Sequence, residues 1–237
     1  SNDVFGTGIN DGSGTGLTVE NTWMHDNPCH GIVVNGNTYS TPNSVNNVVR
    51  GNRVYSNGAD AAGGYGIIIA GATNYSSIVE NLSYSNRLCG IFMNGTNTVL
   101  NQYNEVARNT VYDNNTATTS YGGICLIDTR DNQVHDNRVI GHPAGGIVVG
   151  IDAFSSLRHS IKGNLVIGGL ASSTIGIAID NSTEMDVSEN TIRSFKDRGI
   201  SGSSSTGSKY TGNKITSISD AVSGVDGCIY VGGADSL

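Results

Sequence analysis

The chain has little charge, little proline and no long apolar segment, and each shortage excludes a class of protein. Charged residues make up only 14% of the 237 residues, too few for a disordered polyampholyte. The three prolines exclude a proline-rich linker or a collagen. No run of about 18 apolar residues occurs, so we predict no membrane span. The net charge is −7 and the basic residues form no cluster, which excludes nucleic-acid binding.

Cysteine is also scarce, and its spacing indicates no metal site. The four cysteines, Cys29, Cys89, Cys125 and Cys228, form no C-x-x-C pair. A disulfide is conceivable, but the sequence favours free thiols buried in the core.

Glycine and asparagine are abundant instead. The chain has 33 glycines and 27 asparagines, together 60 of 237 residues. Both residues interrupt helices and occupy tight turns. A folded chain so rich in both is predicted to be all-β, with many short strands.

One asparagine recurs along the whole chain. The recurring residues are Asn21, Asn52, Asn81, Asn109, Asn137, Asn164, Asn190 and Asn213, at spacings of 31, 29, 28, 28, 27, 26 and 23 residues. Valine or isoleucine stands two places after most of them and three places before most of them. A second asparagine follows five places later at Asn57, Asn86 and Asn114. The unit reads roughly V-x-x-N-x-V-x-x-N.

A second block lies between these asparagines. It reads G-I-x-Φ, where Φ is apolar, at residues 31–34, 66–69, 90–93, 123–126, 146–149 and 176–179, with weaker copies at Gly199 and Gly227. Each repeat therefore carries one such strand and one or two further short strands.

These repeats predict a parallel β-helix, a solenoid of about eight coils stacked about 4.8 Å apart. Asparagine suits a corner of such a coil, because it tolerates left-handed backbone angles and its amide can pair with the asparagines above and below. We therefore expect the asparagines from Asn52 to Asn213 to form a ladder. The alternative, an antiparallel sandwich, requires regular two-residue hairpins, which a single repeating frame does not supply.

The G-I-x-Φ blocks and phrases such as Val54-Tyr-Ser-Asn57 resemble the right-handed, pectate-lyase-like parallel β-helices. This superfamily includes polysaccharide lyases, mannuronan C5-epimerases, NosD-like periplasmic proteins and phage tailspikes. The resemblance covers residues 16–231 and implies a right-handed coil, a polysaccharide ligand and a secreted or extracellular location at a cell surface, in a periplasm or on a virion. The D-P-H motif of the epimerases and the R-I-K motif of polygalacturonases are absent, so no catalytic residue is carried over.

We expect residues 1–237 to form one domain, a fragment or processed piece that lacks its end caps. Residues 1–15 predict no capping helix, and residues 228–231 read as a strand that another coil should cover. Flanking regions or a partner chain are expected there.

Asp128, Asp152 and Asp180 are the predicted catalytic residues. They follow the G-I-x-Φ strand in three successive repeats. Carboxylates one or two coils apart would lie about 5 or 9.6 Å from each other, near the separations of retaining and inverting glycosidases. Arg130 and Asp131 accompany Asp128, and we expect them to bind substrate. The alternative is that each aspartate only forms a turn. Asp128, Asp131, Asp152 and Asp180 are also the candidate ligands for Ca²⁺; no other cofactor is indicated.

His30 and Tyr65 are a second candidate pair. They precede the glycines of successive G-I-x-Φ blocks, and His and Tyr suit proton abstraction from a sugar. His25 lies at the same corner, whereas His135, His142 and His159 are predicted to lie on the surface. Six tyrosines are predicted to lie in or beside loops, where they either stack on sugars or only end strands: Tyr39, Tyr65, Tyr75, Tyr103, Tyr112 and Tyr121.

The x residue of each G-I-x-Φ block should point out of the coil. These residues are Val33, Ile68, Phe92, Cys125, Val148 and Ala178. An apolar stripe of this length marks a contact surface. We expect either a homotrimer formed through Val33, Ile68, Phe92 and Val148, or burial of the stripe beneath another segment.

Two functions follow. The first is a carbohydrate-active enzyme, a glycoside hydrolase or lyase, that cleaves or modifies a polysaccharide in a groove on the outer face. The alternative is a non-catalytic shaft or glycan-binding module, as in a tailspike, tail fibre, adhesin or surface protein. The sequence does not choose the glycan.

Overall fold

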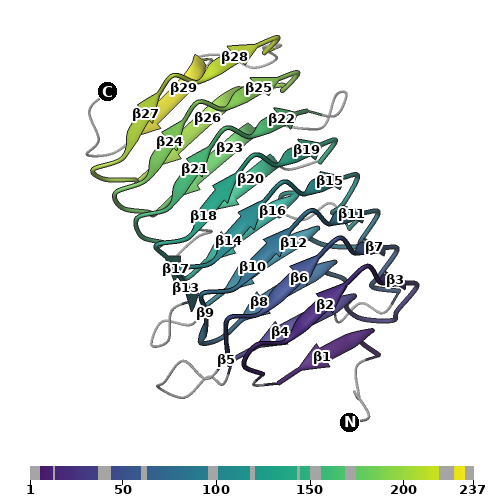
Figure 1. The fold of residues 1–237 in the computed structure, drawn as a ribbon. Helices are drawn as coiled ribbons and strands as arrows, with labels where there is room; N and C mark the ends of the chain where they lie inside the picture. Colours follow the sequence, from purple (N-terminus) through teal and green to yellow (C-terminus); the bar gives the residue numbers. More distant parts are fainter. Residues whose placement is uncertain are drawn as a thin grey trace.

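The computed structural model describes residues 6–12, 14–36, 44–59, 63–95, 101–117, 121–142, 145–149, 156–168, 175–218 and 227–232. These residues form 29 short strands arranged as four parallel sheets (Figure 1). We name the sheets A, B, C and D in the order in which each coil of the chain visits them. Asp152 and Tyr39 lie outside the described residues.

Sheets A and B follow one another in each coil. Sheet A has nine strands: β1 (Ile9–Asp11), β4 (Ile32–Asn35), β8 (Ile67–Ala70), β12 (Ile91–Asn94), β16 (Ile124–Ile127), β20 (Gly145–Val149), β23 (Ile175–Asp180), β26 (Arg198–Ser203) and β29 (Gly227–Gly232). Sheet B has four strands: β5 (Ser44–Val45), β9 (Thr73–Asn74), β13 (Asn101–Gln102) and β17 (Thr129–Arg130). Isolated bridges continue sheet B into later coils, each joining one coil to the next: Arg130–Leu157, Leu157–Thr183 and Thr183–Thr206.

Sheets C and D complete the coil. Sheet C has eight strands: β2 (Thr18–Glu20), β6 (Val48–Arg50), β10 (Ser77–Val79), β14 (Glu105–Ala107), β18 (Gln133–His135), β21 (Ser160–Lys162), β24 (Asp186–Ser188) and β27 (Lys209–Thr211). Sheet D also has eight: β3 (Trp23–His25), β7 (Arg53–Tyr55), β11 (Leu82–Tyr84), β15 (Thr110–Tyr112), β19 (Arg138–Ile140), β22 (Leu165–Ile167), β25 (Thr191–Arg193) and β28 (Lys214–Thr216).

Each strand pairs in parallel with its counterparts one coil earlier and one coil later, except the end strands of each sheet, which pair on one side. In sheet A, for example, Ile91 pairs with Ile67 on one side and with Ile124 on the other. Successive coils stack along one axis from the N-terminus to the C-terminus (Figure 1). Eight coils contribute strands to sheets A, C and D, and β29 adds a ninth strand to sheet A. The predicted all-β solenoid of about eight coils is confirmed.

The interior of the coil is the main hydrophobic core. The Ile and Φ residues of the G-I-x-Φ blocks point inward, as predicted, and are fully buried in six successive coils. The glycine of the block is required by close packing. A Cβ atom at Gly31 or Gly146 would collide with the lumen side chain of Val54 or Val166 on sheet D. The repeating glycine therefore lets sheets A and D converge at their shared corner.

The predicted asparagine ladder lies inside the corner between sheets C and D. Asn109 is typical: its Nδ2 donates to Asn137 Oδ1 (3.0 Å) and to the Ile78 carbonyl (2.8 Å), while its Oδ1 accepts from the backbone N–H and the Nδ2 of Asn81. The same bonds join each asparagine from Asn52 to Asn213 to the next one. The ladder is confirmed.

Asn21, the first of the recurring asparagines, is not a member of the ladder, whose expected members begin at Asn52. Trp23 pairs with Arg53, so Thr22 stands opposite Asn52 and its hydroxyl donates to Asn52 Oδ1 at 2.7 Å. Asn21 occupies the exposed left-handed turn position beside the ladder, with φ of 53°. The ladder position of the first coil is therefore residue 22 and not residue 21, and it holds threonine in place of asparagine.

Two shorter ladders fill other corners, and each contains a buried histidine. Asn57, Asn86 and Asn114 stack at the corner between sheets D and A, and His142 takes the next place. At the B–C corner the stack Asn104, Asn132 continues with His159, whose Nδ1 accepts the Asn132 N–H and whose Nε2 bonds Thr129 Oγ1 at 2.9 Å.

The prediction that these two histidines lie on the surface is wrong. His142 and His159 are each 1% exposed, because the imidazole takes the place of an inward-facing amide. Burial lowers the pKa of each from 6.5 to about 4. Both rings are therefore neutral at physiological pH.

The cysteines agree with the favoured interpretation. Cys29, Cys89 and Cys125 are buried free thiols; the side chain of Cys228 lies outside the described residues. The described residues contain no helix that is long and apolar enough to span a membrane.

Candidate functional site

The structure separates two of the predicted catalytic aspartates. Asp128 follows β16 and forms the turn between sheets A and B, in the same register as Gly95 of the preceding coil. Asp180 is the last residue of β23 and stands in register with Ile127 rather than Asp128. The two aspartates are therefore two coils apart and displaced by one residue along the strand. Asp152, predicted to lie between them, is outside the described residues.

Arg130 and Asp131 lie on the outer side of the coil directly after Asp128. Arg130 Nε donates to Gln102 Oε1 of the preceding coil at 2.6 Å. Asp131 occupies the B–C corner, where Arg158 of the following coil donates to both carboxylate oxygens at 2.8 Å. Asp128, Arg130 and Asp131 thus form one continuous strip across the outside of sheet B.

The two carboxylates of this strip have pKa values shifted in opposite directions. Asp128 is only 6% exposed, and burial raises the pKa of its carboxyl group. The bidentate bond from Arg158 lowers the pKa of Asp131, and the positive charges of Arg158 and Arg130 act in the same direction. Environments that separate the pKa values of neighbouring carboxyl groups are how enzymes assign one as acid and the other as a permanent anion.

Two tyrosines extend this strip along the helix axis. Tyr75 and Tyr103 occupy the B–C corner in the two coils before Asp131, and their rings stack with centroids 5.2 Å apart. They are 58% and 46% exposed. Both have positive φ, 53° and 59°, which disfavours a large side chain. An exposed aromatic side chain in a strained turn stabilises the fold little.

His30 and Tyr65 meet at the D–A corner, with ring centroids 5.4 Å apart. The backbone N–H groups of Gly64 and Tyr65 both lie within hydrogen-bond distance of His30 Nδ1, at 3.3 and 3.4 Å. The Tyr65 ring stacks on Phe92 at 4.4 Å. Burial raises the pKa of Tyr65 far above its ordinary value, and the neighbouring Cys89 acts in the same direction. This pair therefore offers a hydroxyl that donates a hydrogen bond but does not ionise.

Tyr65 belongs to a second apolar cluster on the outer face of sheet A, which contains the predicted stripe. Ile68, Phe92 and Val148 are 5–7% exposed within the single chain, and Tyr65 and Tyr121 pack against the cluster. The stripe was expected either to form a homotrimer interface or to be buried by another segment. Within the single chain these three residues are buried, while Val33 is half-buried. This part of the stripe leaves little apolar surface for a second subunit.

A metal site is not formed by the residues that the structure describes. They contain no group of three or more His, Cys, Asp or Glu side chains placed to hold an ion. Of the candidate Ca²⁺ ligands, Asp131 is bound to Arg158, and Asp128 and Asp180 are two coils apart. Both oxygens of Asp131 already accept hydrogen bonds from a guanidinium, which competes with a cation.

Two known families match this chain over more than half of its length. Residues 1–154 match the family described as right handed beta helix region. Residues 101–229 match the family described as periplasmic copper-binding protein (NosD). The chain belongs to the right-handed β-helix family. No curated protein sequence is significantly similar to it.

Solved structures of other right-handed β-helices have the same fold at low sequence identity. The A-module of the mannuronan C-5 epimerase AlgE4 from Azotobacter vinelandii matches 89% of this β-helix and 58% of its own length, with 18% identity and a TM-score of 0.64. The periplasmic alginate epimerase AlgG matches 91% of this chain and 48% of its own, with 20% identity and a TM-score of 0.58. The Dettilon tailspike protein matches 85% and 41%, with 15% identity and a TM-score of 0.55. This chain thus spans about half the length of these structures.

The copper in the NosD family name finds no counterpart among the residues that the structure describes. The described residues contain no cluster of three metal-binding side chains, and Cys89 and Cys125 are buried among apolar and aromatic side chains. We therefore carry no metal chemistry over to this chain.

Arg158 was missed by the sequence analysis, although the repeat contained a signal for it. It stands 27 residues after Asp131, and the ladder asparagines of the same two coils, Asn137 and Asn164, are also 27 residues apart. The spacing therefore places Arg158 directly above Asp131. Tyr75 and Tyr103 were assigned to loops correctly, but their stacking is a consequence of the same 28-residue register.

Proposed function

We propose that this β-helix binds a polysaccharide on the outside of sheet B and modifies it there. The observation that carries the proposal is the exposed Tyr75–Tyr103 stack beside the Asp131–Arg158 pair. Aromatic side chains supply a large apolar contact area with few rotatable bonds, and the neighbouring carboxylate and guanidinium bond hydroxyl groups. Tyr75, Tyr103, Asp131 and Arg158 follow one another along the axis of the β-helix in four successive coils, which suits an extended polymer.

Asp128 is the proposed general acid. Its raised pKa keeps the carboxyl protonated to higher pH than an ordinary aspartate, while Asp131 stays ionised. The Cα atoms of residues three apart in an extended segment are at most about 10 Å apart. This backbone limit leaves room for the carboxyl separation of inverting glycosidases, about 6.5–9.5 Å. Asp152, Asp180, His30 and Tyr65 remain further candidates for the reaction.

Binding is tested by electrophoresis of the chain through gels that contain one polysaccharide each, across a panel of polymers. We expect at least one polymer to retard the chain, and the double variant Tyr75→Asn/Tyr103→Asn to migrate freely. Asparagine accepts positive φ, so the fold should survive the change. The matched control is Glu80→Gln/Arg108→Gln, which changes the equivalent exposed positive-φ positions of the C–D corner. Equal retardation of both variants would contradict the proposed surface.

Catalysis is tested on the retained polymer by assays for new reducing ends and for the absorbance of unsaturated uronates. Asp128→Asn should reduce turnover by orders of magnitude and leave retardation unchanged, because an amide keeps the shape but donates no acidic proton. Retention without any product would instead favour the non-catalytic glycan-binding module. The low exposure of Asp128 is the observation that favours this second function.

The epimerase named AlgG and the NosD family are periplasmic by their names. An extracytoplasmic location for this chain, at a cell surface, in a periplasm or on a virion, is part of the proposal, because the chain would encounter a polysaccharide ligand there.

A further inference from the structure

The outside of sheet D carries a column of aromatic rings that the strip on sheet B does not use. His25, Tyr55, Tyr84 and Tyr112 stand at the last position of four successive strands, and their ring centroids are 4.7, 4.8 and 4.8 Å apart. The rings are parallel to within 10°. Because their faces cover one another, the column presents ring edges and a row of hydroxyl groups to the solvent.

Arg53 and Trp23 stand beside this column. The Arg53 guanidinium lies 5.3 Å from the Trp23 ring and 5.4 Å from the Tyr55 ring, and its Nε donates to the Tyr84 hydroxyl at 2.9 Å. Trp23 is nevertheless 67% exposed. A guanidinium held between aromatic rings is oriented before any ligand arrives, while an exposed tryptophan leaves apolar area for one.

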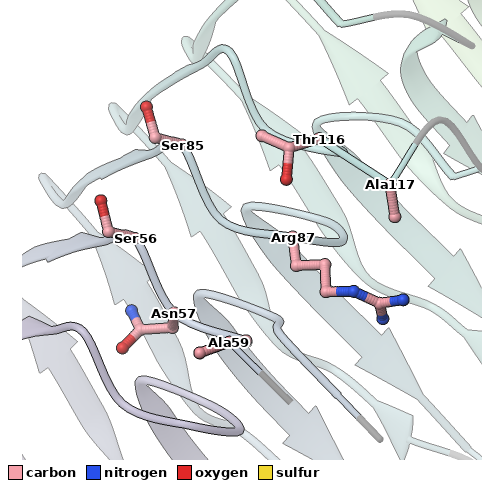
Figure 2. A pocket seen from close by; sticks show the side chains of 8 residues that line it. Ser56, Asn57, Ala59, Ser85, Arg87, Thr116 and Ala117 are labelled. Atoms are coloured by element: carbon pink, nitrogen blue, oxygen red, sulfur yellow. The ribbon is translucent and has the colours of Figure 1, made fainter. Parts of the chain in front are cut away.

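A pocket of about 450 Å³ opens where this column ends, at the D–A corner (Figure 2). Ser56 and Ser85 follow Tyr55 and Tyr84 directly, both with φ of 53°, and their hydroxyls point the same way from successive coils (Figure 2). Thr116 adds a third hydroxyl, and Ala59 and Ala117 add methyl groups. Arg87 is the one charged residue among those that line the pocket, and its Nη1 donates to the Gly63 carbonyl at 3.3 Å.

These lining groups define the chemistry of an occupant. Three hydroxyl groups bond other hydroxyls, the alanine methyls cover apolar C–H surface, and the guanidinium favours an anion. Figure 2 shows Arg87 at the side of the pocket away from the two serines, so the anion and the hydroxyls of the ligand must stand apart. A sugar ring with one acidic substituent has this arrangement.

We propose that this pocket is a second saccharide-binding site, which takes a sugar unit carrying an anionic group on Arg87. The choice of a saccharide as the ligand rests on the proposed function, whereas the pocket itself does not depend on it. In the order A, B, C, D around the coil, the D–A corner is diagonally opposite the B–C corner with Tyr75 and Tyr103. A polymer bound at the pocket stays attached to the protein while the strip on sheet B is free.

The experiment is a titration of the ¹⁵N-labelled chain, followed by amide NMR shifts. The probes are trisaccharides of four hexuronic acids, the matching neutral trisaccharides, and inorganic sulfate. We expect at least one uronate to shift the amides of Ser56, Ser85, Arg87 and Thr116, and to bind at least tenfold more tightly than its neutral counterpart. Arg87→Gln should weaken the uronate at least tenfold, whereas Arg138→Gln, an exposed arginine on sheet D outside the pocket, should not.

Several outcomes would overturn the assignment. No binding by any uronate, or equal affinity for charged and neutral trisaccharides, would contradict it. So would NMR shifts confined to residues outside the pocket. Sulfate binding as tightly as the sugar would indicate a simple ion site. The Tyr75→Asn/Tyr103→Asn variant separates this test from that of the proposed function. If it keeps the pocket shifts, the second site stands whether or not the sheet B strip binds polymer.

Discussion

Inside the corner between sheets C and D, asparagine stands in seven successive coils, whereas the outside of the B–C corner changes from coil to coil. The outer residues are Asn46, Tyr75, Tyr103, Asp131, Arg158 and Glu184, all with positive φ. The inner amides each satisfy buried backbone groups of two neighbouring coils, so any other side chain leaves those groups unpaired. The outer side chains face water, so the fold places few demands on them.

The difference teaches where stability and function lie in this solenoid. The same corner geometry supports a repeated residue where the side chain is buried and a variable one where it is exposed. A large aromatic residue at an outer corner is therefore more informative than any member of the inner ladders. The following experiments break or sharpen this contrast, from the largest expected effect to the smallest.

Acidification should break the inner ladders at their two histidines. Burial lowers the pKa of His142 and His159 from 6.5 to about 4 in the folded chain. As the pH falls, these histidines therefore become protonated in the unfolded chain before they do so in the folded chain. Stability should be complete above pH 6.5 and decline toward pH 4. The loss approaches about 3 kcal/mol for each histidine, at about 1.4 kcal/mol per pH unit. Urea midpoints measured from pH 7 to 4.5 test this.

His159→Asn is the control for the pH effect. Asparagine occupies this ladder position in other coils, as Asn104 and Asn132, and has a matching acceptor and donor. The variant should fold and lose part of the pH dependence. A pH profile identical to that of the wild type would show that His159 does not titrate on unfolding.

Asn109→Ala should destabilise the chain by about 3 kcal/mol, because it leaves several buried donors and acceptors unpaired. The paired control is Asn46→Ala at the outer B–C corner, where only the strain of a positive φ is added, about 1 kcal/mol. Urea unfolding of both variants gives the comparison. Equal losses would remove the distinction between inner and outer corners.

Val139→Ala should cost about 2 kcal/mol, through the cavity it leaves in the lumen. The neighbouring Arg138→Ala, on the outside of the same strand, should change stability by less than about 0.5 kcal/mol. Thermal or urea unfolding measures both, and a reversed order would mean that β19 faces the other way.

Tyr75→Asn should have the smallest effect on stability, between zero and about 1 kcal/mol of stabilisation, because asparagine tolerates positive φ better than tyrosine. A loss of more than 1 kcal/mol in urea unfolding would instead mean that the tyrosine stack supports the fold.

Periodicity alone determined most of the architecture. The G-I-x-Φ blocks and the asparagine spacing predicted the parallel coils, the inward Ile and Val, the ladder and the outward stripe. They succeed because each coil repeats the same local environment, so a residue type that recurs at one position reports what that position requires. The same logic failed at Asn21, where threonine replaces the ladder amide, and at His142 and His159, where a different side chain makes equivalent hydrogen bonds.

Only the tertiary structure decided how residues of different coils meet. Variable loop lengths shift the register by single residues, which is why Asp128 and Asp180 occupy different positions although both follow a G-I-x-Φ strand. The burial that raises the pKa of Asp128 is not visible in the repeat, and the pocket beside Arg87 arises between residues about one coil apart. These properties depend on which side chains stack vertically. That stacking is set by the exact length of every coil, and the local pattern within a repeat does not contain it.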